Sequence, residues 1–156
     1  MSSISYKDAR RDPSLRLAFL GEIDLEDKTK YIESLYPSQT YAPDNCLMAC
    51  TPRMSYGLTS IITIYPNAFE TFQNMDEFLS ALIDHEGKHA EDFFNDFNPD
   101  VRGLEIRAYQ NQIDNFPRRP NCGEFFRNKT RENLELFTQM NPAEAMLLAT
   151  REGFTI

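Results

Sequence analysis

The 156-residue chain has no tryptophan, three cysteines and two histidines. It also lacks any run of about 18 apolar residues, so no transmembrane helix is expected. Residues 1–11 are polar and charged, which argues against a signal peptide. Cys46, Cys50 and Cys122 lack the spacing of a metal finger or a redox pair, which favours free thiols over a disulfide framework. We therefore expect a cytoplasmic protein.

Positive charge is scarce as well, because 16 Lys and Arg stand against 24 Asp and Glu and give a net charge of −8. An acidic surface repels nucleic-acid phosphates and anionic membranes, so neither is expected as a partner. The hydrophobic content of 41% and the charged content of 26% are typical of a soluble globular protein. We expect a single domain over residues 1–156, with the polar residues 1–14 flexible.

Local patterns place the strands early and most of the helices late. A helix is expected over 24–35, and strands rich in apolar or β-branched residues are expected over 46–50 and 58–65. Helical spacing, caps and prolines predict further helices over 76–94, 99–116, 124–140 and 142–153. The sequence thus predicts an α+β fold, in which a small N-terminal antiparallel or mixed sheet precedes a helical hairpin and C-terminal helices.

Both histidines lie in one pentad, His85-Glu86-Gly87-Lys88-His89, which has the form HExxH. Residues four apart lie on one face of a helix, so both imidazoles can bind a single Zn²⁺. Glu86 would then lie beside the open position of the metal, where it can take a proton from water. The pattern is short, and its alternative interpretation is a pair of solvated or capping histidines.

A catalytic zinc usually has three protein ligands, so a carboxylate, a cysteine or a tyrosine must supply the third. If the helix after the turn near residues 97–99 runs antiparallel to the pentad helix, Glu105 lies level with His89, each about eight residues from the turn. Glu105 falls toward the apolar side of its helix, where a carboxylate is costly without compensation. The alternative is that Glu105 pairs with Arg102 or faces solvent.

His85, His89 and Glu105 resemble the zinc ligands of zincin metallopeptidases of the gluzincin type, over about residues 56–116. The resemblance implies a minimal single-domain metallopeptidase that binds one Zn²⁺ per chain and cleaves a peptide or protein substrate. It also implies that Glu86 is the general base. Where the best-known members have an aspartate one turn after the ligand glutamate, this chain has Tyr109. With no further histidine present, Tyr109 is the nearest candidate for an auxiliary catalytic residue, and Tyr56 and Tyr65 are the alternatives.

Two further expectations concern the surroundings of the metal. Ligating histidines usually donate their second N–H to a carboxylate or carbonyl, and Asp92, three residues after His89, is the candidate acceptor. Alternatively, Asp84, Glu91 and Asp92 form a solvated acidic face. A peptide could also add beside the 58–65 strand, whose isoleucines would pack in the core beneath the helix.

The functional prediction is therefore a zinc-dependent metallopeptidase. A non-catalytic zinc-binding or interaction protein is the first alternative, and a structural helical protein with a chance HExxH is the second. The sequence offers no obvious fourth ligand, which favours an open site over a closed structural one. Because ligation needs neutral imidazoles, activity should fall at acid pH.

Overall fold

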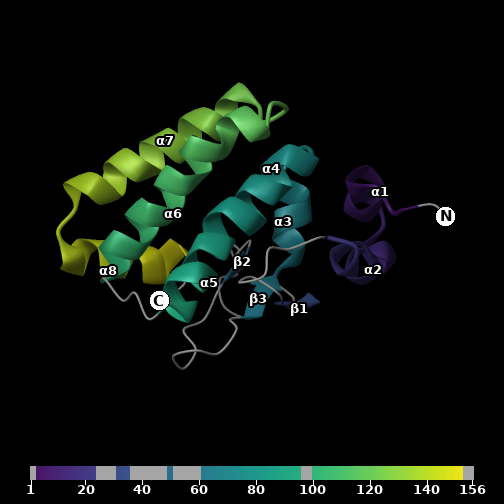
Figure 1. Cartoon of the computed structure of the whole chain (residues 1–156), viewed down its shortest axis with the longest axis horizontal. Helices are drawn as coiled ribbons and strands as arrows, with labels where there is room; N and C mark the ends of the chain where they lie inside the picture. Colours follow the sequence, from purple (N-terminus) through teal and green to yellow (C-terminus); the bar gives the residue numbers. More distant parts are fainter. Residues whose placement is uncertain (1–2, 24–30, 36–48, 51–60, 96–99, 153–156) are drawn as a thin grey trace.

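The computed structural model describes residues 3–23, 31–35, 49–50, 61–95 and 100–152 (Figure 1). Its helices are α1 (Tyr6–Arg11), α2 (Arg16–Gly21), α3 (Pro66–Thr71), α4 (Met75–Leu79), α5 (Gly87–Phe94), α6 (Val101–Asn115), α7 (Glu124–Gln139) and α8 (Pro142–Glu152). The π-helical segment η3 (Ser80–Glu86) joins α4 to α5, and short 3₁₀ turns form η1 (Pro13–Leu15) and η4 (Phe116–Arg118). None of the described helices has both the length and the apolar character needed to span a bilayer.

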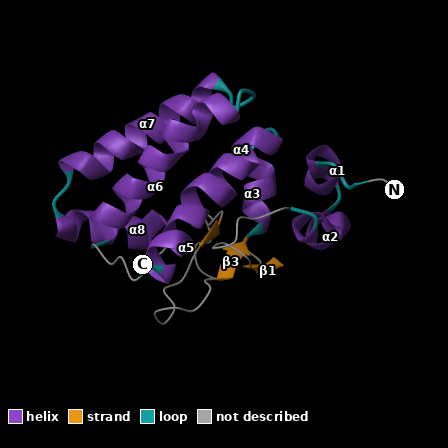
Figure 2. Cartoon of the chain, viewed as in Figure 1, coloured by secondary structure: helices purple, strands orange, loops and turns teal. Residues whose placement is uncertain are grey.

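The predicted α+β class is wrong, because the fold is all-α in class (Figure 2). The extended segments β1 (Tyr31–Leu35), β2 (Ala49–Cys50) and β3 (Ile61–Ile64) have only five, two and four residues. They pair in the order β1-β3-β2, with β1 parallel and β2 antiparallel to β3. Strands this short cannot form a layer with a core of its own, so the helices supply the framework.

The helix expected over 24–35 is also wrong in its described part, since residues 31–35 form β1. Pairing with β3 outweighs the helical spacing of these residues. Residues 24–30 lie outside the described residues, as do parts of the predicted 46–50 and 58–65 strands. Within the described residues, β1 pairs along one edge of β3 and β2 pairs along part of the other, so the edge that the sequence suggested for a substrate peptide is at least partly occupied.

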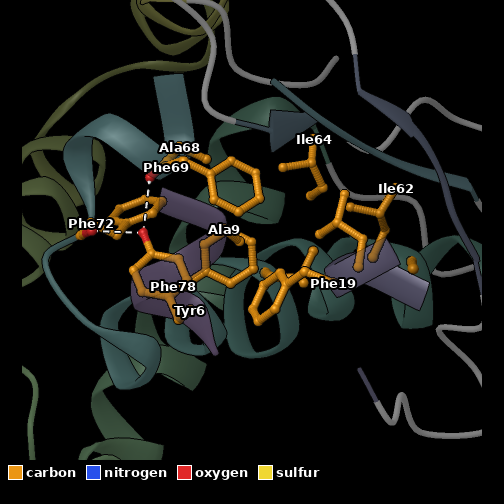
Figure 3. Packing of buried hydrophobic residues seen from close by; sticks show 12 residues of the cluster. Tyr6, Ala9, Phe19, Ile62, Ile64, Ala68, Phe69, Phe72 and Phe78 are labelled. Atoms are coloured by element: carbon orange, nitrogen blue, oxygen red, sulfur yellow. Dashed lines mark hydrogen bonds between the residues drawn. The ribbon is translucent and has the colours of Figure 1, made fainter. Parts of the chain in front are cut away.

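The main core packs aromatic rings between the N-terminal helices and the α3–α4 region (Figure 3). Tyr6, expected to be flexible, is buried in α1, and its ring centroid lies 4.9 Å from that of Phe78. The Tyr6 hydroxyl donates to the carbonyl of Phe72 at 2.6 Å and to that of Ala68 at 3.4 Å. Ile62 and Ile64 are buried in the same cluster, as predicted. The small sheet is thus anchored through the helical core.

The long helix predicted over 76–94 is present as the run α4–η3–α5, but it begins earlier. Asn74 is its N-cap, and the Asn74 side chain accepts from the backbone N–H of Glu77. α6 packs against η3, α5, α7 and α8, so it is the central helix of the C-terminal half (Figure 1). The predicted capping box before α8 is confirmed, because Asn141 and Glu144 each accept the other's backbone N–H.

Candidate metal centre

The HExxH pentad spans the junction between η3 and α5. The backbone N–H of Gly87 reaches the carbonyl of Leu82, five residues earlier, which is the hydrogen bond of a π-helix. His85 and Glu86 therefore lie in the wider π turn, while His89 lies in regular α-helix. Both histidine rings are buried, with centroids 4.9 Å apart. π-helical turns inside α-helices are frequent at functional sites.

α6 brings Glu105 to the two histidines. The helix begins at the N-cap Asp100, whose side chain accepts from the N–H of Gly103; the predicted cap at Asn98 and Pro99 lies outside the described residues. One face of α6 is buried along its whole length, and Glu105 lies in the middle of that face with an exposed fraction of 0%. Arg102, the alternative partner of Glu105, instead donates to the carbonyls of Met140 and Thr138.

The three side chains meet at one point. Glu105 Oε2 lies 2.8 Å from His89 Nε2, and Glu105 Oε1 lies 3.2 Å from His85 Nε2. The donor atoms of all three residues lie within 4.8 Å of one another, and the group could hold a metal ion. The set of two imidazoles and one carboxylate suits Zn²⁺, which takes three protein ligands in open sites.

The hydrogen bonding of this group is incomplete in a way that points to a cation. Both oxygens of Glu105 and both ring nitrogens of His89 are buried without a hydrogen-bond partner within the described structure. The 2.8 Å contact between them brings the charges close but does not have hydrogen-bond geometry. A fully buried, unsatisfied carboxylate is among the most costly groups in a protein, and a bound cation would compensate it.

The charges of the group depend on each other. Burial alone would lower the pKa of His89, but the carboxylates of Glu105, Glu86 and Asp92 outweigh burial and raise this pKa to about 9. Burial alone would raise the pKa of Glu105, but attraction to His89 and His85 lowers it to about 2. A raised pKa of His89 and a lowered pKa of Glu105 both favour an ion pair between an imidazolium and a carboxylate.

A residue that the sequence analysis missed orients His85. Gln112 Oε1 lies 2.9 Å from His85 Nδ1, and Gln112 Nε2 donates to Ser80 Oγ at 3.1 Å. Because the Gln112 amide oxygen can only accept, Nδ1 carries a hydrogen, and the neutral tautomer that this bond favours has its lone pair on Nε2, the nitrogen nearest Glu105. The signal was present in the sequence, since Gln112 lies seven residues after Glu105 and so on the same helix face.

Asp92 does not lie where the sequence suggested. Both of its oxygens accept from Arg107, at 2.8 and 2.9 Å, and His89 Nδ1 has no hydrogen-bond partner in the described part of the chain. The pair of Asp92 and Arg107 instead joins α5 to α6. The sequence could not show this, because the choice between His89 and Arg107 depends on how the two helices face each other.

Tyr109 lies against the centre, but its hydroxyl points toward α7. Its ring centroid is 4.5 Å from that of His85, and its hydroxyl accepts from the side-chain amide of Asn133 at 3.4 Å. The ring thus forms a wall of the site. A catalytic role for Tyr109 stays a prediction.

Glu86 connects the centre to a cavity of about 540 Å³. Its carboxylate lies 3.8 Å from His85 Nε2, and the residue is only 6% exposed. The cavity runs between the pentad helix and α7, and its wall includes Phe72, Ala81, Phe125, Phe126, Lys129 and Asn133. A bound molecule in this cavity would reach Glu86 and His85 together.

Comparisons of the chain with protein-family models, with curated proteins and with solved structures find no match. The functional argument therefore rests on the geometry of the centre. Three buried donors converge, an additional carboxylate stands beside them, and a cavity leads to both. Such an arrangement can bind a divalent cation and carry out acid–base chemistry next to it.

Proposed function

We propose that this chain is a zinc-dependent metallopeptidase in which His85, His89 and Glu105 hold one Zn²⁺. The observation that carries the proposal is the fully buried Glu105 carboxylate, whose two oxygens face the two histidines without hydrogen bonds. Among the described residues, the group that could hold a metal supplies three donors and no fourth, which suits an open site.

Glu86 is the general base of the proposed reaction. When bound, Zn²⁺ polarises a carbonyl and lowers the pKa of water at the site. Glu86 accepts the proton of the attacking water and passes it to the leaving amine of the peptide. Gln112 keeps His85 in the tautomer that leaves Nε2 free for the metal. The buried walls exclude bulk water from these steps.

The cavity between the pentad helix and α7 receives the substrate. Phe72, Phe125 and Phe126 make much of its wall aromatic. A peptide entering along this wall places a carbonyl beside His85 and Glu86, which line the same cavity. The substrate of the proposed enzyme is thus a peptide or a flexible protein segment narrow enough to enter between two helices.

Metal analysis of three proteins tests the proposal. We expect one Zn²⁺ per purified wild-type chain, loss of zinc in His85→Ala, and retention of zinc in Glu86→Gln. Hydrolysis of a peptide library should fall by at least about 10²-fold in Glu86→Gln, the lower range for loss of a general base. Wild-type protein that binds no zinc, prepared without chelator, would contradict the whole proposal. Full zinc binding with equal turnover by wild type and Glu86→Gln would contradict the peptidase alone and favour a non-catalytic zinc-binding protein.

A further inference from the structure

The carboxylate of Asp84, the residue just before His85, is bound by an arginine that is not part of the metal centre. Arg119, which follows η4, donates Nε and Nη2 to the two carboxylate oxygens of Asp84 at 3.0 and 3.1 Å. Only 6% of the Asp84 side chain and 13% of the Arg119 side chain are exposed. Asp84 and Arg119 border a separate cavity that shares no described lining residue with the cavity at Glu86. The pair therefore does not touch the reacting groups.

The main chain of Asp84 is held as well. Asn111 of α6 donates its side-chain N–H to the Asp84 carbonyl at 2.9 Å. The amide of Asn115 in turn lies 3.3 Å from the Asn111 side-chain oxygen, and Arg118 donates to the Asn115 oxygen at 3.2 Å. A chain of side-chain hydrogen bonds thus runs from the end of α6 to the backbone of the π turn.

These contacts act on a segment that does not keep its shape unaided. π-helical turns are rare because their hydrogen bonding is less favourable than that of the α-helix, so tertiary contacts must maintain them. Asp84 lies in the π turn immediately before His85 and Glu86. Its side chain is fixed by Arg119 and its carbonyl by Asn111, so the path of the backbone into His85 is set from α6 and from the residue that follows η4.

We propose that Asp84, Arg119 and Asn111 form a positioning clamp that fixes the π turn and thereby sets where the His85 ring and the Glu86 carboxylate lie relative to Glu105. The inference rests on the proposed metal site. A contribution to folding stability is a poor explanation of the Asp84–Arg119 ion pair, because the free energy of desolvating a buried ion pair roughly cancels the attraction between its charges. α6 then carries the third donor, the orienting residue of His85 and part of the clamp, namely Glu105, Gln112 and Asn111.

Cobalt is the probe for this clamp, because the visible absorption of bound Co²⁺ reports the arrangement of its ligands. The first test variant is Arg119→Gln, which loses the guanidinium that donates two hydrogen bonds to Asp84. The second is Arg119→Lys, which keeps one charged donor. The matched control is Arg107→Gln, which breaks the other bidentate Arg–Asp pair, the one between α6 and Asp92. Wild type and the three variants are loaded with Co²⁺, and peptide hydrolysis is measured on the zinc forms.

We expect Arg119→Gln to shift the cobalt spectrum and to weaken metal binding about tenfold, the lower end of the range for residues that support metal ligands. Its kcat should fall while KM stays the same, because the aromatic wall of the substrate cavity lies outside the clamp and is unchanged. Arg119→Lys should lie between wild type and Arg119→Gln. Arg107→Gln should keep the wild-type spectrum even if its melting temperature falls.

Three outcomes would overturn parts of the inference separately. If both glutamine variants melt earlier but keep the wild-type spectrum and kcat, the clamp is only structural. If wild type binds Co²⁺ and hydrolyses no peptide, the proposed function fails and the spectra alone decide on the clamp. If wild type binds no Co²⁺, both fail. Far-UV circular dichroism identifies a variant that does not fold, and Arg119→Lys then serves in place of Arg119→Gln.

Discussion

At the scale of single residues, the His89 imidazole gives the clearest prediction about metal binding. The pKa of His89 is raised to about 9, above its ordinary 6.5, so folding favours the protonated form. This stabilisation of the metal-free protein is complete below pH 6.5 and is lost as the pH rises through about 9. A metal ligand must be a neutral imidazole, so a cation binding at the centre has to displace this proton.

Zinc binding should therefore release about one proton per chain between pH 7 and 8. Titration calorimetry in buffers of different ionisation enthalpy measures this number directly. The apparent affinity for zinc should rise about tenfold per pH unit in the same range and level off above the His89 pKa. Binding without proton release would mean that His89 is already neutral in the metal-free protein.

Gln112 gives a second prediction at this scale. Gln112→Leu removes the acceptor of His85 Nδ1 and leaves a buried N–H unpaired. Loss of such a partner typically weakens metal binding about 10–100-fold, and we expect a change in that range by competition with a chromogenic chelator. Gln112→Glu keeps an acceptor at the same place and should retain most of the affinity. Equal affinities for wild type and Gln112→Leu would exclude an orienting role.

At the scale of elements, side-chain hydrogen bonds from Tyr6 and Arg10 attach the N-terminal helix α1 to the α3 region. Tyr6 donates to the carbonyls of Phe72 and Ala68 at the end of α3. Tyr6→Phe keeps the aromatic packing and removes only these bonds, which should cost about 1 kcal/mol of unfolding free energy. Urea denaturation measures the change, with Leu17→Ala, at a position 61% exposed, as a near-neutral control. A cost equal to that of the control would mean that aromatic packing and the Arg10 hydrogen bonds hold α1 without the Tyr6 hydroxyl.

The elements also show where sequence patterns succeed. The helices of the C-terminal half were predictable because caps, prolines and apolar spacing agree there; α7 and α8 lie within a few residues of their predicted bounds. The 31–35 segment was not, because its spacing suits a helix while its partner strand, thirty residues later, favours extension. The π turn at Ser80–Glu86 was equally hidden, since contacts from α6 and from Arg119 hold it.

At the scale of the whole molecule, the centre joins two helices that face each other across the fold. His85 and His89 lie on the η3–α5 run and Glu105 lies on α6, so a bound cation crosslinks the two (Figure 1). Metal that binds only the folded chain stabilises it by about 2.7 kcal/mol when its free concentration is 100 times Kd.

Zinc should accordingly raise the melting temperature of chelator-treated protein, and a chelator should reverse the effect. Calorimetry with zinc at a large excess over Kd measures the shift. Glu105→Gln, which has lost the buried charge, should show a much smaller shift because its site offers a weaker third donor. A zinc-induced rise of equal size in Glu105→Gln would place the stabilising metal elsewhere on the chain.

The sequence alone determined which residues could form the centre. With two histidines in one HExxH, and with Glu105 at the matching distance beyond the helix turn, counting along two helices was enough to propose the group. Only the tertiary structure decided what surrounds it. Gln112 rather than Asp92 orients a histidine, and Arg107 takes both oxygens of Asp92. The fold class, too, was decided by the tertiary structure, because the paired strands are too short to form a layer and the helices supply the core. Local spacing fixes the face of a helix, but which groups meet across two helices depends on their rotation and packing, which no local pattern encodes.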